Sequence, residues 1–318
     1  MIPDGRTPVF VVTGFLGSGK TTLVNELVKR MGETLVIVNE FGEVPVDHHL
    51  MQAAEEKAVA LPNGCLCCHL RGDLEETLIG AAMRRRRGEI AGFDRVVVET
   101  SGLADPGPVA QTLYADRALE RDFKLGPIVT VVDAADTGKG NLGLDIAKSQ
   151  IAAADVIVLS KVDLATGLAA LKEEVEALNP HARQVPARFG DVDPALLEKS
   201  GTDRVFSTVA HHDHGINTFH LEFDRPPRKD LLERFLALLV ELRGADLLRV
   251  KGIVALEGGE HVTVQGVRHV FDRLRPIENR PPTGLVFITR NMAERDVQAL
   301  WQAMSSLKAM NRSGAGLE

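Results

Sequence analysis

Long hydrophobic runs are missing from this sequence. No stretch of the chain approaches the roughly 20 consecutive apolar residues that a membrane-spanning helix needs. The amino-terminal residues also lack the basic-then-apolar pattern of a secretory signal, and their apolar run is accounted for by a first β-strand. We therefore expect a cytoplasmic protein with no membrane partner.

An excess of positive charge is missing as well. The chain has 37 Lys and Arg residues against 44 Asp and Glu residues, which gives a formal net charge of −7. Such a chain has no overall basic field to attract nucleic acid, so no nucleic-acid partner is expected. The strongest local cluster, Arg84 to Arg87, is interpreted as the solvated end of a helix that starts near Asp73, because cations suit the negative end of a helix.

Cysteine is almost absent, and its distribution is unusual. All three cysteines, Cys65, Cys67 and Cys68, lie within four residues, which is a poor layout for a disulfide framework and a good one for a thiolate metal site. In an extended segment Cys65 and Cys67 project to the same side, so they could bind one ion together. Thiolates favour zinc or monovalent copper, and added carboxylate or imidazole ligands extend the choice to cobalt, nickel or ferrous iron.

Two other interpretations of the cysteine segment stay open. Isolated cysteines are often small buried hydrophobic residues, and Cys65 and Cys68 have the spacing of a redox pair, although no helix start follows to lower a thiol pKa. The residues that could complete a metal site are Glu43, His48, His49 and His69.

A phosphate-binding loop is clearly present. The apolar residues Val9 to Val12 predict a short buried strand, and the following residues match the pattern G-x-x-x-x-G-K-[ST]. The backbone N–H groups of such a loop bind a polyphosphate together with the positive end of the next helix. We expect Lys20 to contact the β- and γ-phosphates and the Thr21 hydroxyl to bind magnesium. The predicted nucleotide-binding residues of this loop are Gly14, Gly17, Ser18, Gly19, Lys20, Thr21 and Thr22.

Acidic residues follow the next predicted strands. Leu35 to Val38 leads into the polar loop Asn39 to Asp47, where phosphate-loop proteins sense the γ-phosphate and magnesium, so Glu43 and Asp47 are candidate metal ligands. The alternative is an ordinary acidic surface loop.

A further strand, Arg95 to Glu99, ends in a carboxylate. Glu99 is expected to hold magnesium through water, and the Gly102 N–H is expected to face the γ-phosphate. Glu99 could instead be a helix cap.

The segment Ser160 to Asp163 follows another buried strand, Val156 to Leu159. A carboxylate at Asp163 can accept hydrogen bonds from N1–H and the exocyclic amine of guanine, whereas adenine presents an acceptor at N1. With Lys161 beside it, Asp163 therefore predicts GTP rather than ATP. The usual motif begins with Asn and Ser160 is shorter, so a simple strand-to-helix turn capped by Asp163 is the alternative.

The order of these elements predicts an α/β fold: a P-loop NTPase domain with a mainly parallel sheet flanked by helices, over residues 1–205. A histidine-rich linker over 206–216 contains His211 to His214, which could bind a divalent metal transiently or simply be solvated. A small α+β domain over 217–310 and a tail over 311–318 complete the chain. No catalytic constellation occurs in the small domain.

Together the motifs resemble the CobW-type metallochaperone GTPases, relatives of the hydrogenase- and urease-maturation GTPases, and the resemblance covers nearly the whole chain. The segments that carry it read GFLGSGKTT, NEFG, GCLCC, ETSGLADP and SKVD. It implies a GTPase with Lys20, Thr21 and Glu99 at the reaction centre and a metal motif formed by Cys65, Cys67 and Cys68, with Glu43 nearby.

The same resemblance implies that GTP and magnesium control delivery of a transition metal, zinc first and cobalt or iron next, to a client metalloprotein. A homodimer is compatible with it. We identify no glutamine that would position water and no arginine finger, so slow basal turnover is expected. The alternatives are a GTP-gated metal-buffering or regulatory protein and a phosphate-loop kinase acting on a small molecule. A kinase would be expected to carry a lid rich in arginine.

Overall fold

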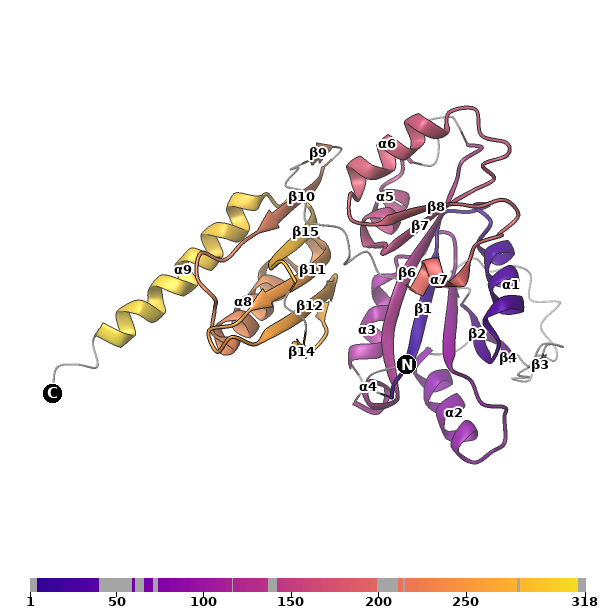
Figure 1. Cartoon of the computed structure of the whole chain (residues 1–318), viewed down its shortest axis with the longest axis horizontal. Helices are drawn as coiled ribbons and strands as arrows, with labels where there is room; N and C mark the ends of the chain where they lie inside the picture. Colours follow the sequence, from indigo (N-terminus) through magenta and orange to yellow (C-terminus); the bar gives the residue numbers. More distant parts are fainter. Residues whose placement is uncertain are drawn as a thin grey trace, which may run out of the picture. The chain divides into compact units, whose positions relative to one another are not determined.

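The protein is represented by a computed structural model, which describes residues 5–39, 59–60, 66–70, 74–115, 117–136, 142–198, 211–213, 215–278 and 281–313. The chain divides into two compact units, Met1–Gly201 and Thr202–Glu318 (Figure 1). Each unit is considered by itself. Among the described residues, no helix has the length and apolar character needed to cross a membrane.

A twisted, mostly parallel sheet forms the centre of the first unit. Its strand order is β3-β4-β2-β5-β1-β6-β7-β8, and each described neighbouring pair is parallel except β3 with β4. The strands are β1 (Thr7–Thr13), β2 (Thr34–Asn39), β3 (Val59–Ala60), β4 (Leu66–Leu70), β5 (Arg95–Thr100), β6 (Phe123–Asp133), β7 (Val156–Ser160) and β8 (Arg183–Pro186). The central strands are nearly continuous runs of valine and isoleucine because both of their faces are buried.

Helices cover the two faces of this sheet, with α1 and α3 on opposite sides (Figure 1). The helices are α1 (Lys20–Met31), α2 (Leu74–Arg86), α3 (Gly107–Ala115), α4 (Arg117–Asp122), α5 (Asp145–Ala153), α6 (Leu168–Leu178) and α7 (Pro194–Glu198). The apolar stripe of α1, including Leu23 and Leu27, packs on Phe10 and Val12 of β1 in one buried cluster. The predicted α/β fold is confirmed.

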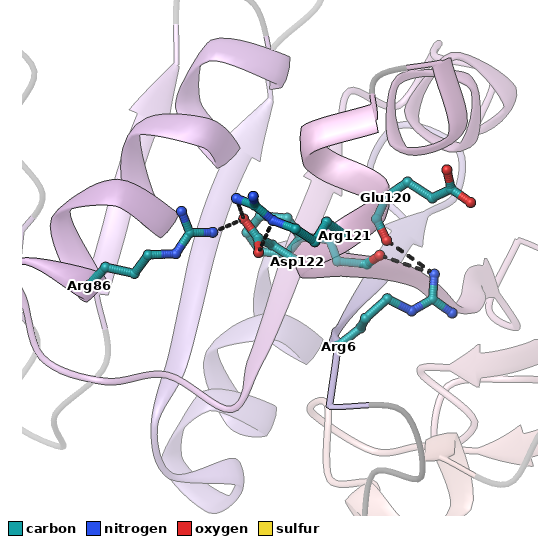
Figure 2. Close-up of polar contacts among 6 residues, drawn as sticks. Arg6, Arg86, Glu120, Arg121 and Asp122 are labelled. Carbon is teal, nitrogen blue, oxygen red and sulfur yellow. Dashed lines mark hydrogen bonds and ion pairs between the residues drawn. The ribbon is translucent and has the colours of Figure 1, made fainter.

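The four arginines at the end of α2 are exposed, as predicted, and two of them, Arg85 and Arg86, also contact other parts of the unit. The Arg85 guanidinium lies over the Phe93 ring, 4.8 Å from its centroid, and donates to the Thr7 hydroxyl. In Figure 2, Arg86 from α2 and Arg121 from α4 approach the Asp122 carboxylate from different sides.

Arg6, just before β1, approaches the same end of α4. Its guanidinium donates to the backbone carbonyls of Glu120 and Phe123 (Figure 2). These contacts, together with those of Arg86 and Arg121, join β1, α2 and α4.

The second unit is a mainly antiparallel sheet with strand order β13-β12-β11-β15-β10-β9, and β14 pairs with β12. Its strands are β9 (His211–Asp213), β10 (Ile216–Leu221), β11 (Leu247–Ala255), β12 (His261–Val267), β13 (Val270–Phe271), β14 (Arg275–Ile277) and β15 (Gly284–Arg290). Helices α8 (Lys229–Arg243) and α9 (Glu294–Ser313) contribute to its core, where the Trp301 ring meets Phe223 and Phe235 edge to face.

Two boundaries differ from the sequence prediction. The histidine-rich stretch was expected to be a linker without strands, yet His211–Asp213 forms β9 and pairs with β10. A three-residue edge strand is too short to show alternation in the sequence, so only pairing with β10 reveals it. The tail was expected from residue 311, yet α9 continues to Ser313.

Candidate nucleotide site

The loop between β1 and α1 has the backbone that phosphate binding requires. Gly14, Gly17 and Gly19 have φ angles of 140°, 73° and 96°, in the region that side chains disfavour. A Cβ atom on Gly14 would lie 2.2 Å from the Val131 carbonyl oxygen, so only glycine fits there. The predicted phosphate loop therefore has both the conformation and the packing of such a loop.

Lys20, the first residue of α1, is largely buried beside this loop. Its ammonium donates to the Phe15 carbonyl at 3.0 Å. Burial lowers the pKa of Lys20 below its ordinary value of 10.5, and the nearby Glu99 carboxylate opposes that shift. A partly desolvated ammonium at the positive end of a helix interacts strongly with a phosphate that enters the loop.

The side chains of Thr21 and Glu99 lie next to each other near the carboxyl end of β5. The Thr21 hydroxyl donates to Glu99 Oε1 at 2.6 Å. Glu99 ends up there because β5 lies between β1 and β2, where it pairs with Val12 on one side and Val38 on the other. The carboxylate is 5% exposed, and its Oε2 has no hydrogen-bond partner among the described residues.

These two side chains fit a magnesium ion. Mg²⁺ prefers oxygen ligands and keeps several waters, so the Thr21 hydroxyl would bind it directly and the Glu99 carboxylate would hold it through water. The buried Oε2 of Glu99 would then gain a partner. When bound, the ion would neutralise phosphate charge during hydrolysis.

The segment after β5 packs directly on the phosphate loop. A Cβ atom on Gly102 would lie 2.7 Å from the backbone nitrogen of Leu16, so the two segments approach too closely for any larger residue at this position. This contact places Gly102 beside the phosphate loop, consistent with the predicted role of its N–H.

Ser160 and Lys161 connect β7 to the same loop. The Ser160 hydroxyl donates to the Ser18 carbonyl at 2.6 Å, and the Lys161 ammonium donates to the Gly17 carbonyl at 2.9 Å. Lys161 also forms an ion pair with Asp133, at the end of β6. Ser160 is shorter than the asparagine that usually begins this motif. Its hydroxyl nevertheless reaches the phosphate loop and links the segment Ser160 to Asp163 to that loop.

A pocket of about 280 Å³ lies beside this segment, and both Asp163 and the predicted loop residue Thr22 line it. Sequence reasoning missed two other lining residues, Leu164 and Phe189, which are 64% and 80% exposed. Phe189 also has a φ angle of 50°, an uncommon backbone conformation for an aromatic residue. The signal that could have revealed it is an aromatic residue before Gly190 in the loop after the last strand.

Comparisons with known proteins agree with this geometry. Residues 8–186 match the CobW/HypB/UreG nucleotide-binding domain, and residues 216–305 match the cobalamin synthesis protein cobW C-terminal domain. The chain belongs to the CobW/HypB/UreG family.

Two relatives extend the match over most of the chain. The zinc chaperone YjiA of Escherichia coli K12 is 33% identical over 313 residues, which cover 93% of this chain and 98% of YjiA. The zinc-regulated GTPase metalloprotein activator 1 of Schizosaccharomyces pombe is 30% identical and covers 86% of this chain and 78% of its own length.

Solved structures of YjiA share the fold of this chain. The crystal structure of the Zn(II)-bound YjiA GTPase superposes with a TM-score of 0.72 at 29% identity, over 94% of this chain and 99% of YjiA. A second structure, also Zn(II)-bound, is of a YjiA triple mutant in which one glutamate and two cysteines are replaced by alanine.

Three of the predicted metal ligands, Cys65, Glu43 and Asp47, lie outside the described residues, as do the further candidates His48 and His49. The backbone of Cys67 and Cys68 is described, and it lies inside β4, where they pair with Val36 and Ile37 of β2. Among the described side chains, no group of three or more His, Cys, Asp or Glu residues could hold a metal ion. The cysteine motif therefore remains a prediction, and its described part, Cys67 and Cys68, lies on a strand of the central sheet.

Proposed function

We propose that this chain is a GTP-hydrolysing metallochaperone that binds a transition metal ion, zinc first, at its Cys-x-Cys-Cys segment and delivers it to a client protein under nucleotide control. One observation carries the proposal. The strand that contains Cys67 and Cys68 lies beside β2, and β2 lies beside β5, the strand that contains Glu99.

The register supports a short path between the two sites. His69, directly after Cys68, pairs with Val38, and Val38 pairs with Glu99. Because neighbouring strands lie about 4.8 Å apart, the backbones of His69 and Glu99 are separated by about 10 Å. The carboxyl ends of β4, β2 and β5 thus lie at one edge of the sheet.

The nucleotide half of the proposal rests on the residues of the phosphate loop and the pocket. Lys20 holds the β- and γ-phosphates, Thr21 and Glu99 hold magnesium, and the Gly102 N–H faces the γ-phosphate. Asp163 accepts hydrogen bonds from the guanine edge in the pocket that Leu164 and Phe189 line. Relatives of the chain are named GTPases and zinc chaperones, which supports the same assignment.

Metal binding and nucleotide binding are coupled in this proposal through the loop after β2. In this proposal GTP with magnesium acts on residues 40–47, which lie outside the described residues, and the nucleotide state thereby sets metal affinity. A coupling free energy of about 1–3 kcal/mol would change metal affinity about 5- to 150-fold. Thiol deprotonation accompanies metal binding, so metal affinity should weaken at low pH.

The test is zinc titration of the full chain with a non-hydrolysable GTP analogue, with GDP and without nucleotide. Dissociation constants that change with nucleotide, and that lose this dependence when Cys67 and Cys68 are replaced by serine, support the proposal. The serine variant is needed as a control because the YjiA mutant lacking two cysteines is still zinc-bound, so a background of other sites is expected. Equal dissociation constants in all three nucleotide states would overturn the proposal.

Phosphate release identifies the reaction class. Stoichiometric release of inorganic phosphate from GTP, without a phosphorylated small molecule, excludes a kinase. Transfer of zinc to an apo-protein client only in one nucleotide state separates a chaperone from a metal-buffering protein.

A further inference from the structure

Gln150, a residue of α5, contacts the segment that follows β5. It is 1% exposed, and its side-chain nitrogen donates to the Ala104 carbonyl at 2.9 Å and to the Gly102 carbonyl at 3.3 Å. One buried amide therefore binds two carbonyls of the segment whose Gly102 packs on the phosphate loop. Burying a polar side chain so completely is unfavourable unless its hydrogen bonds are made, so this arrangement is specific.

The 101–104 segment also has hydrogen bonds of its own. The Ala104 N–H donates to the Ser101 carbonyl and the Leu103 N–H donates to the Ser101 hydroxyl, so these bonds shape a local turn. Local bonds shape the segment but do not place it relative to the sheet. Gln150, 46 residues away from Ala104 in sequence, does place it.

The other side of Gln150 is anchored to the sheet beneath the phosphate loop. Its backbone carbonyl accepts a hydrogen bond from the Thr130 hydroxyl at 2.7 Å, and Thr130 pairs with Thr13, the last residue of β1 before the loop. The position of the Gln150 amide is therefore set by the same strands that set the phosphate loop.

A small cavity connects Gln150 with the phosphate loop. It has a volume of about 20 Å³ and is lined by both Gln150 and Ser18. The Oε1 of Gln150 and the hydroxyl of Ser18 are buried without a hydrogen-bond partner in the described part of the chain. A cavity of this size holds one water, which would have polar groups of both residues as partners.

We propose that Gln150 is a positioning residue: its hydrogen bonds hold the 102–104 segment in the position where the Gly102 N–H faces the γ-phosphate. The inference rests on the proposed GTPase function. GDP has no γ-phosphate, so Gln150 distinguishes GTP from GDP and contributes little to the affinity for GDP.

The chemistry of the side chain gives a sharp test. A glutamine amide offers two N–H donors on one nitrogen, which matches two carbonyl acceptors. In Gln150→Leu both donors are lost. In Gln150→Glu a carboxylate would face two carbonyl oxygens, whereas the protonated acid donates one hydrogen bond, and burial raises the pKa of such an acid. The affinity of the glutamate variant for the GTP analogue and its hydrolysis rate should therefore recover as the pH falls.

The experiment measures the dissociation constants for GDP and for a non-hydrolysable GTP analogue, and single-turnover GTP hydrolysis across the pH range. We expect Gln150→Leu to lose about tenfold in affinity for the GTP analogue and about tenfold in hydrolysis rate, with GDP affinity unchanged. Gln150→Glu should match the leucine variant at alkaline pH and approach the wild type at acidic pH.

The matched control is Gln184→Leu. Gln184 also donates from a partly buried amide to a backbone carbonyl, that of Lys172 at 3.0 Å, but it lies on β8. This variant should keep the wild-type ratio of GTP to GDP affinity.

Three outcomes would overturn the inference. They are an unchanged affinity ratio in folded Gln150→Leu, an equal loss of GDP and GTP affinity, and a glutamate variant whose hydrolysis does not respond to pH. Failure of the proposed function is distinguishable, because a wild-type protein that binds GTP without hydrolysing it contradicts the GTPase assignment while the affinity ratio still tests Gln150. Wild-type protein that binds neither nucleotide overturns both.

Discussion

The Thr21 hydroxyl donates a hydrogen bond to the Glu99 carboxylate at 2.6 Å, and this bond joins the first turn of α1 to the end of β5. The two residues are 78 positions apart in sequence. Both are the expected magnesium groups, and the Thr21 oxygen keeps lone pairs that can bind a metal ion while its proton is donated to Glu99. The hydrogen bond therefore holds the two expected magnesium groups next to each other.

Replacing Thr21 with alanine should remove the direct magnesium ligand. We expect GTP hydrolysis to fall about 100-fold or more, because charge stabilisation at the transferred phosphate is lost. Thr21→Ser keeps the hydroxyl and should retain most of the activity. Turnover measured over a magnesium titration checks this, and equal rates for Thr21→Ala and wild type would contradict the assigned role.

Phe189→Ala should weaken the binding of GTP and of GDP to the same extent. Its exposed ring lines the pocket that contains Asp163, and stacking of an aromatic side chain on a base contributes about 1–3 kcal/mol, so affinity should fall about tenfold. Fluorescent-nucleotide titration measures both constants. Phe189→Trp preserves a stacking surface and serves as the control. A loss confined to GTP would place Phe189 at the phosphates instead of the base.

Ser160→Ala should cost both stability and nucleotide affinity. The Ser160 hydroxyl donates to the buried Ser18 carbonyl at 2.6 Å and is 3.2 Å from the Val132 carbonyl. Its loss leaves buried acceptors without this donor, which should lower the free energy of unfolding by about 1–2 kcal/mol. Urea denaturation and GDP titration check the two effects, and a variant that loses neither would show that the Ser160 bridge is dispensable.

Asp122→Asn tests the cluster in Figure 2. Burial alone would raise the pKa of Asp122, but hydrogen bonds from Arg121 and Arg86 outweigh it and hold the pKa below the ordinary 3.8. A lowered carboxylate pKa stabilises the fold above pH 3.8, and this contribution is lost as the pH falls through the lowered pKa.

Both arginines are half exposed or more, so water screens the pairs and the expected loss of unfolding free energy in Asp122→Asn is about 1 kcal/mol at neutral pH. Urea denaturation of the variant and the wild type at neutral and acidic pH gives the difference. That difference should shrink on acidification, and one that grows instead would contradict the sign of the pKa shift.

Much of the first unit was predictable because its signals are local. The run Val9–Val12 predicts a buried strand from composition, and the spacing of Gly14, Gly19 and Lys20 predicts a phosphate loop without knowledge of any distant residue. Glu99 near the end of β5 and the segment Ser160 to Asp163 could be predicted to lie near the nucleotide site, because parallel strands bring their carboxyl ends to one edge of the sheet.

Other features needed the tertiary structure. The cysteine segment was predicted to be extended, but nothing in it indicates that β4 would pair with β2, because strand neighbours are chosen by long-range packing. The role of Ser160 depended on a distance to Ser18 that its residue type alone does not reveal.

By itself, the sequence determined the glycine-rich loop after β1, the order of strands and helices, and the presence of a cysteine-rich segment, since each depends on residues close together in the chain. The tertiary structure decided which side chains meet. Phe189 joins Asp163 at one pocket, and Gln150 reaches the carbonyls of Gly102 and Ala104. Such contacts join residues that are far apart in the sequence, so they depend on how the helices pack on the sheet. A buried amide can form its hydrogen bonds only when this packing brings the acceptors within reach.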